Sequence, residues 1–107
     1  MKIEIFNNIQ IIIGENAEEN WKIIDFNSNY TWLHLNSFPS CHVIIQSDDI
    51  DNEILNYAGQ LCKKNTKYKN LKNLKICYTK CNNLIKGTEI GSVYFKSNRK
   101  VKKILLS

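Results

Sequence analysis

Hydrophobic and polar positions along the chain follow the two periods that distinguish strands from helices. Two β-branched runs near the start, residues 2–6 and 9–13, are joined by Asn7 and Asn8, which tolerate the positive φ of a two-residue hairpin turn. Apolar side chains also alternate or run together in five later segments, and each of these is predicted to be a strand. They cover residues 30–35, 42–46, 74–79, 92–95 and 101–106.

Two further segments have helical periodicity and helix start signals. Asn16 with Glu19 three positions later resembles a capping box and predicts a short helix over about residues 17–25. A longer helix, about residues 49–65, is predicted after Ser47-Asp48-Asp49, because apolar side chains recur there on one helical face. Those apolar residues are Ile50, Ile54, Ala58, Leu61 and Cys62.

Strands and helices that are segregated along the chain predict an α+β fold. We expect a single domain over residues 1–107, with a largely antiparallel, twisted sheet of about six to seven strands and two helices. No apolar run approaches the ~20 residues of a membrane span, and the first residues lack the apolar stretch of a signal peptide. The expectation is therefore a cytoplasmic protein without a membrane partner.

The charges are sorted along the sequence. Residues 1–53 hold nine acidic side chains and two lysines, whereas residues 54–107 hold thirteen basic side chains and one acid, Glu89. A codon bias toward lysine would enrich it everywhere and would not divide the charges by half. A positive pole on a small domain suits an acidic partner, most often a phosphate backbone. The open alternative is that the acidic half folds against the basic half and neutralises it.

Four cysteines and two histidines raise the question of a metal, but their spacing matches no zinc pattern, so we predict no metal and no cofactor. Cys62 and Cys77 occupy apolar positions, where a free thiol behaves as a small hydrophobe. His34 and His42 lie on consecutive strands joined by a tight turn and are expected to face each other. Such a pair suits acid–base chemistry, phosphate contact, or two polar positions at the lip of a sheet.

Several motifs occur together in one order. The most specific is the segment Trp32-Leu33-His34-Leu35-Asn36-Ser37-Phe38-Pro39-Ser40-Cys41-His42-Val43-Ile44-Ile45. The others are the strand that ends at Gly14 with Asn16 and Asn20 after it, then Tyr78-Thr79, Asn83-Leu84-Ile85-Lys86 and Gly91-Ser92-Val93-Tyr94-Phe95. Together they resemble the NFACT RNA-binding domain family, and the last two resemble its short, stand-alone eukaryotic members.

The sequence departs from that family at two places. Ser40 and Cys41 replace the common Gly-Ser of the turn, and the sequence stops at Ser107 without the coiled coil that often follows the domain. The resemblance implies an RNA-binding module. In multidomain relatives this module works in ribosome-associated quality control, where tRNA and stalled large subunits are handled, and DNA binding is suggested for stand-alone members.

We therefore expect the protein to dock tRNA or ribosomal RNA without catalysis of its own. DNA, the ribosome and a protein are the other partners to consider. His34 and His42 would flank the binding lip with Trp32 supporting it, and basic residues of the second half would hold phosphates. The aromatic rings of Trp32, Tyr78 and Tyr94 would stack on bases if exposed and belong to the core if buried.

The predicted nucleic-acid-binding residues are Trp32, His34, His42, Lys63, Lys64, Lys67, Lys75, Tyr78, Lys80, Lys86, Lys96, Arg99 and Lys100. Lys69, Lys72, Lys102 and Lys103 are expected in the same electrostatic footprint. Because lysine makes fewer bidentate contacts than arginine, the predicted binding depends on charge and shape more than on base sequence.

Other functions remain open at this point. The first is an RNA-modifying or RNA-cleaving enzyme that uses His34 and His42 as acid and base. The second is a protein-interaction adaptor whose basic face meets an acidic partner, and the third is a general binder of DNA and RNA.

Overall fold

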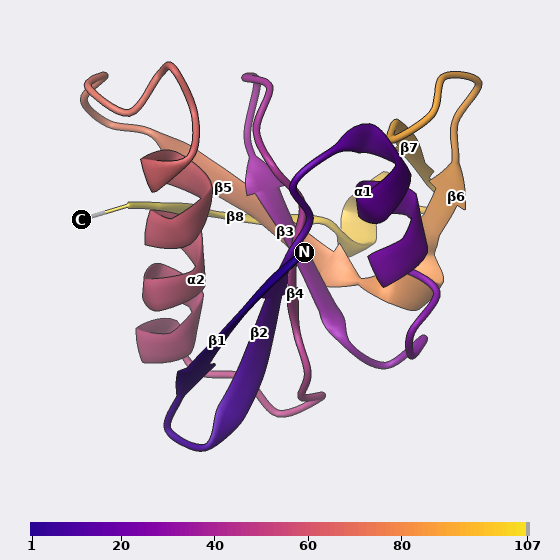
Figure 1. Cartoon of the computed structure of the whole chain (residues 1–107), viewed down its shortest axis with the longest axis horizontal. Helices are drawn as coiled ribbons and strands as arrows, with labels where there is room; N and C mark the ends of the chain where they lie inside the picture. The colour runs from indigo at the N-terminus through magenta and orange to yellow at the C-terminus, as the bar shows by residue number, and fades with distance from the viewer. Residues whose placement is uncertain (107) are drawn as a thin grey trace.

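The chain, seen in a computed structural model that describes residues 1–106, is built on a six-stranded antiparallel sheet (Figure 1). In the order of the sheet its strands are β1 (Lys2–Phe6), β2 (Ile9–Ile13), β4 (Val43–Ile45), β3 (Thr31–Leu35), β5 (Lys75–Lys80) and β8 (Lys102–Leu105). The helices are α1 (Ala17–Ile23) and α2 (Asn52–Lys64), with short 3₁₀ turns η1 (Cys81–Asn83) and η2 (Asn98–Lys100). The predicted α+β class and antiparallel sheet are confirmed.

A second sheet has only two strands, β6 (Leu84–Lys86) and β7 (Val93–Phe95), which form an antiparallel hairpin. The sequence predicted the second of these strands but not the first, because a three-residue run gives no clear alternation. The hairpin leaves the main sheet after η1 and returns to it through η2 and β8 (Figure 1).

The long helix begins later than predicted. Asp51, rather than the Ser47-Asp48-Asp49 segment, is its N-cap: the Asp51 carboxylate accepts a hydrogen bond from the Ile54 backbone N–H at 2.9 Å. The Ser47 hydroxyl instead closes a local turn with Asp49, in which it accepts from the Asp49 N–H at 3.1 Å. Two cap-like segments in succession therefore produce one turn and one helix.

The two faces of the main sheet carry separate cores. Leu33 and Leu35 point to the face covered by α2, here called the α2 face. Trp32 and His34 point to the opposite face, here called the histidine face, as the alternation of this strand predicts. On the histidine face α1 and the β6–β7 hairpin cover Trp32, Ile12 and Ile44 but not the whole surface.

No helix in the described part of the chain is long and apolar enough to cross a membrane.

The substitution Ile44→Ala tests how far the core under α1 supports the fold. Ile44 is fully buried on β4, the strand that lies between β2 and β3 in the sheet. Its truncation is therefore expected to lower the free energy of unfolding by about 2–5 kcal/mol. The matched control is Ile85→Ala on β6, where the side chain is 47% exposed and the expected loss is about 1 kcal/mol or less. Urea denaturation followed by tryptophan fluorescence measures both, and equal losses would contradict the assignment of Ile44 to the core.

Candidate nucleic-acid interface

One row of residues crosses the part of the histidine face that α1 and the hairpin leave open. His34 on β3 is paired in register with Cys77 on β5, and Cys77 is paired with Lys103 on β8. On the other side of His34 lies His42, directly before β4, with ring centroids 5.2 Å apart and ring planes at 83°. The expected facing of the two histidines is confirmed, and the row ends in a lysine.

Trp32 supports this row from the core. Its ring lies parallel to the ring of His34, with centroids 5.7 Å apart, and meets His42 edge-on at 5.4 Å. Phe95 of β7 packs edge-on against the same indole at 5.6 Å. Because Trp32 is only 2% exposed, its position fits the expected supporting role under the histidines and leaves its ring little surface for stacking on RNA.

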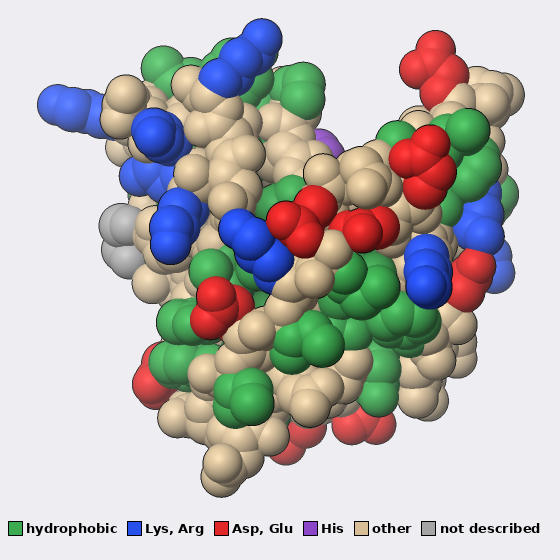
Figure 2. Space-filling model, in the orientation of Figure 1, with side chains coloured by type: hydrophobic (Ala, Val, Ile, Leu, Met, Phe, Trp, Pro, Cys, Tyr) green, Lys and Arg blue, Asp and Glu red, His purple; other side chains and the backbone are tan. Residues whose placement is uncertain are grey.

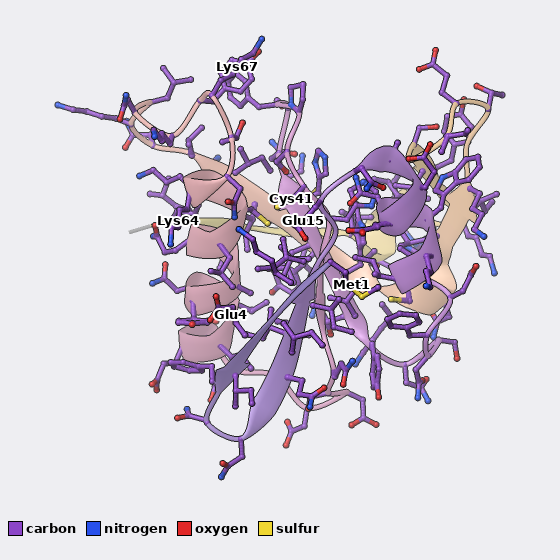
Figure 3. All side chains as sticks on the ribbon, viewed as in Figure 1. Met1, Glu4, Glu15, Cys41, Lys64 and Lys67 are labelled. Carbon is purple, nitrogen blue, oxygen red and sulfur yellow. The ribbon has the colours of Figure 1, made fainter. Side chains whose placement is uncertain are left out.

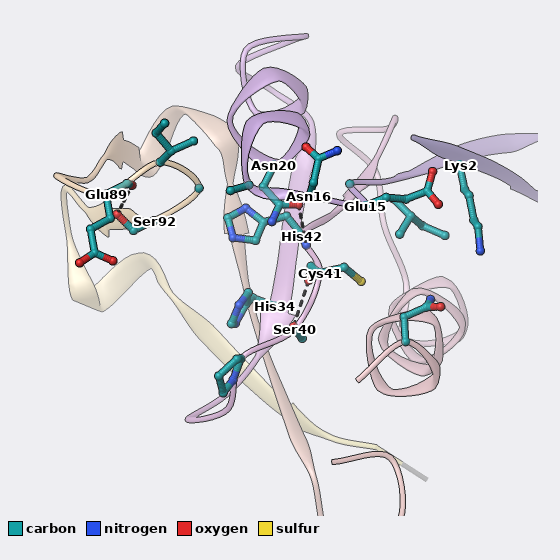
Figure 4. A pocket seen from close by; sticks show the side chains of 17 residues that line it. Lys2, Glu15, Asn16, Asn20, His34, Ser40, Cys41, His42, Glu89 and Ser92 are labelled. Carbon is teal, nitrogen blue, oxygen red and sulfur yellow. Dashed lines mark hydrogen bonds between the residues drawn. The ribbon is translucent and has the colours of Figure 1, made fainter. Parts of the chain in front are cut away.

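The two histidines form the common floor of two adjoining cavities. The first, here called the polar cavity, has a volume of about 750 Å³ and lies between the start of α1, the β3–β4 turn and the β6–β7 loop. Figure 4 shows Glu89 and Ser92 of that loop on one side of the histidines, and Glu15 and Lys2 on the other.

The second cavity, here called the aromatic cavity, has a volume of about 490 Å³. Its lining includes Trp32, His34, Phe38, His42, Cys77 and Phe95. Of the residues that line it, all within the described part of the chain, none is a lysine, arginine, aspartate or glutamate. The two cavities thus differ in charge, although they share both histidines.

A close contact between α1 and the sheet fixes His42. The Asn20 side-chain oxygen accepts a hydrogen bond from the His42 backbone N–H at 3.2 Å, and the His42 carbonyl accepts one from the Gly14 N–H at 3.0 Å. A Cβ atom at Gly14 would lie 2.2 Å from that Asn20 oxygen, so a larger residue there would displace the Asn20 side chain from its hydrogen bond with His42. The motif that ends a strand in glycine and places an asparagine in the next helix therefore positions a histidine.

The β6–β7 loop is tied to the same helix. The Trp21 indole N–H donates to the Ser92 carbonyl at 2.7 Å. Gly91 has a φ of +89°, and a Cβ atom there would lie 3.0 Å from Ala17. Helix α1 therefore holds one wall of both cavities at a defined distance from the histidines.

Both histidines are neutral near pH 7. Burial lowers the pKa of His42 to about 3, with the nearby His34 adding to the effect. Burial also lowers the pKa of His34, although the Leu35 and Ser40 carbonyls oppose it. The His34 Nδ1 lies 2.7 Å from the Leu35 carbonyl, which can only accept, so Nδ1 carries the proton and Nε2 is left as an acceptor.

His42 has an unsatisfied nitrogen. Its Nδ1 is buried and has no hydrogen-bond partner among residues 1–106, and the same is true of the Trp32 indole nitrogen. A buried polar group without a partner costs about 1–3 kcal/mol. Both residues line the aromatic cavity, so its wall contains two polar nitrogens that have no partner within residues 1–106.

The predicted basic residues do not form one footprint. Lys63 and Lys64 lie in the last turn of α2, and Lys67 lies in the loop that follows (Figure 3). Figure 2 shows basic side chains gathered over this region. Lys75, from β5, and Lys103 lie on the histidine face. Tyr78, Lys80 and Lys100 instead line a separate cavity of about 240 Å³ that includes the other face of β5.

Two predicted contact residues are held by the protein itself. Lys80 donates to the backbone carbonyls of Asn29 at 3.1 Å and Asp48 at 2.8 Å. Lys86 pairs with Asp25 at 2.6 Å. Within residues 1–106, this is the one ion pair between a basic side chain and a carboxylate at 4 Å or less. Direct ion pairs therefore do not neutralise the basic half of the chain against the acidic half.

The remaining predicted residues are at the surface. Lys96 follows β7, and Arg99 lies in η2; both are exposed. Tyr94 is 56% exposed on β7 and contributes to neither histidine cavity.

Sequence reasoning did not assign Phe38, Cys77 and Phe95 to the site. The alternation of β5 places Cys77 on the histidine face once the register with His34 is known, but that register is a long-range property. The thiols of Cys62, Cys77 and Cys81 are buried, as predicted for Cys62 and Cys77, whereas Cys41 is half-buried.

A pH titration tests the neutrality of the histidines. Neither ring is expected to titrate with a midpoint near 6.5 in NMR spectra of the folded protein, since burial lowers both pKa values. Unfolding exposes His42 and restores its ordinary pKa, so the unfolded chain binds more protons below pH 6.5. The free energy of unfolding should then decrease as the pH falls from about 6.5 toward 3, by up to about 1.4 kcal/mol per pH unit for one histidine.

The control for this titration is His42→Gln, which should flatten the pH dependence between pH 6.5 and 5, where carboxylates remain ionised. A ring that titrates near pH 6.5 in the folded protein would contradict the burial argument.

Comparisons with known proteins identify the family of this chain. Residues 4–97 match the model of the NFACT protein RNA binding domain. Protein JLP2 of Saccharomyces cerevisiae is 32% identical over 108 residues, and the match covers 89% of this chain and 52% of the yeast protein. This chain therefore spans about half the length of that curated relative.

A solved structure shares the fold. The C-terminal part of the fibronectin/fibrinogen-binding protein from Streptococcus suis superimposes with a TM-score of 0.87 at 18% identity, over 99% of this chain and 44% of that one. At this identity the likeness concerns the fold alone. The matched range, the collinear motifs and the histidine row together place the chain in the NFACT RNA-binding domain family, a family of RNA-binding domains.

Proposed function

We propose that this domain docks tRNA or ribosome-associated RNA in the cytoplasm, in translation or ribosome quality control, and carries out no chemistry on it. The observation that carries the proposal is the open part of the histidine face, where Lys75 and Lys103 lie next to the neutral cleft of His34 and His42. Exposed lysines attract phosphates, and a concave, uncharged surface beside them suits the sugars and bases.

The chemistry of the cleft favours docking over catalysis. An acid–base mechanism needs one group that donates a proton and another that accepts it. Burial lowers the pKa of both histidines, so neither ring holds the second proton of a general acid near neutral pH. The rings also contact each other edge-on instead of facing a substrate from two sides.

The basic surface favours binding by charge and shape. Because lysines far outnumber the single arginine, Arg99, phosphate contacts dominate over bidentate reading of bases. Structured RNA presents closely spaced phosphates and unpaired loops at once, and tRNA has both. A protein partner, as the name of the Streptococcus suis protein states for that protein, is the competing outcome of the test.

The test is a fluorescence-anisotropy titration with tRNA, single-stranded RNA and duplex DNA at several salt concentrations. Binding is expected to favour tRNA and to weaken with salt. The variant Lys75→Gln/Lys103→Gln should reduce the slope of log affinity against log salt by about 1.4–1.8, since each lost phosphate contact contributes about 0.7–0.9. The matched control is Lys86→Gln, because Lys86 is paired with Asp25 and lies on the hairpin.

Each contrary outcome has a separate meaning. Equal affinity for all three nucleic acids would indicate a general polyanion surface. A smaller salt dependence of affinity in Lys86→Gln, but not in Lys75→Gln/Lys103→Gln, would place the phosphates near the β6–β7 hairpin and not over β5 and β8. No binding to any of them would contradict the RNA-docking proposal and leave the basic surface for a protein partner, and any cleaved or modified tRNA would contradict the absence of catalysis.

A further inference from the structure

We propose that the aromatic cavity binds one unpaired nucleobase of the docked RNA, while Lys75 and Lys103 hold the phosphates beside it. This inference rests on the proposed RNA docking and names the part of the RNA that the cleft recognises.

The cavity has the size and lining that a flat, uncharged ring requires. Its volume of about 490 Å³ lies within the usual range of small-molecule pockets. Phe38, Phe95 and the edge of Trp32 contribute aromatic surface, and no charged side chain lines it in the described part of the chain. A phosphate in this cavity would lose its water without gaining a cation, whereas a base would lose little hydration and gain ring contacts.

The two histidines supply hydrogen-bonding groups for the edge of the base. His42 is only 4% exposed, lines the cavity, and keeps an Nδ1 without a partner among residues 1–106. His34 has its Nδ1 engaged with the Leu35 carbonyl, which leaves an acceptor at Nε2. The base edges present donors and acceptors side by side, so neutral imidazoles match a base better than they match an anion.

The rings are also arranged for stacking. Trp32 and His34 lie nearly parallel, at an interplanar angle of 10°, and Phe95 closes the buried end of the group edge-on. A base in the cavity would therefore contact rings that are already held in place by packing against Trp32 in the core. Stacking of this kind accepts any base, in agreement with weak sequence preference.

The charges around the cleft determine where the RNA backbone runs. Cys77 lines the aromatic cavity, and its register partner Lys103 is one strand away, a spacing of about 4.8 Å between strands. Because the two residues are direct register partners, their side chains project from the same face of the sheet. The polar cavity is lined by Glu89 on one side of the histidines and by Glu15 with Lys2 on the other, so its two carboxylates repel phosphates and outnumber its one cation (Figure 4). The backbone is therefore expected over β5 and β8, with one base turned toward the histidines.

The experiment compares two probes that have the same number of phosphates. One is an eight-nucleotide single-stranded RNA, and the other is the same ribose-phosphate chain without bases. The wild-type protein is expected to bind the RNA about tenfold more tightly than the abasic chain, as one stacked base provides. In NMR spectra, the ring signals of His34 and His42 should shift with the RNA and not with the abasic chain.

Three variants locate the effect. His34→Ala removes an acceptor and ring surface, and Cys77→Phe fills the cavity; each should abolish the tenfold difference and leave affinity for the abasic chain unchanged. Lys75→Gln/Lys103→Gln should weaken binding of both probes equally. The control is Tyr94→Ala, which removes an exposed aromatic ring outside the cavity. Circular dichroism confirms that each variant is folded, and His34→Ala with the NMR shifts decides the matter if Cys77→Phe does not fold.

The failures of the two proposals are distinguishable. Equal affinity for RNA and abasic chain, or a base effect that survives His34→Ala without histidine shifts, overturns the nucleobase site and leaves RNA docking intact. Binding of tRNA without binding of the eight-nucleotide RNA has the same meaning. Failure to bind tRNA, RNA and abasic chain alike contradicts the docking proposal itself.

Discussion

The incomplete cover of one sheet face is the constraint on which the rest of this structure depends. Helix α2 packs along the α2 face and closes it with a continuous apolar core. Helix α1 and the short β6–β7 hairpin cover the histidine face less completely, and the smaller core beneath them includes Ile12, Ile44 and Trp32. The next row of that face holds His42, His34 and Cys77, which line the aromatic cavity: His34 is half-buried, whereas His42 and Cys77 are buried.

That arrangement places the neutral histidine side chains and the charged lysine side chains on neighbouring strands of one face. Desolvation keeps the two imidazoles neutral, while Lys103, two strands from His34, is at the exposed edge of the sheet. Charge at the rim provides long-range attraction that salt weakens, and the neutral floor provides short-range contacts that salt hardly changes. A single row of a β-sheet can therefore place a base-sized site and a phosphate site at the spacing of neighbouring strands.

Local patterns predicted much of this site, because they depend on properties within one strand or one turn. Alternation alone placed Trp32 and His34 on one face, and the tight turn placed His42 opposite His34. What the sequence left open is decided by contacts distant along the chain. The hydrogen bonds of Lys80 to Asn29 and Asp48, and the register that brings Cys77 beside His34, follow from tertiary packing. Charge sorting likewise predicted a basic pole but not its division between the end of α2 and the histidine face.

The proposed function gives a physical reason for the unsatisfied His42 nitrogen beside the cleft. A leucine in place of His42 would fill the same buried volume without an orphaned nitrogen, so packing alone does not require an imidazole. Asn20 of α1 and Gly14 nevertheless hold that residue in position through hydrogen bonds to its backbone. Departures from local stability rules concentrate at functional sites. The support given to a residue that stability would replace is the strongest physical reason to place recognition at this cleft.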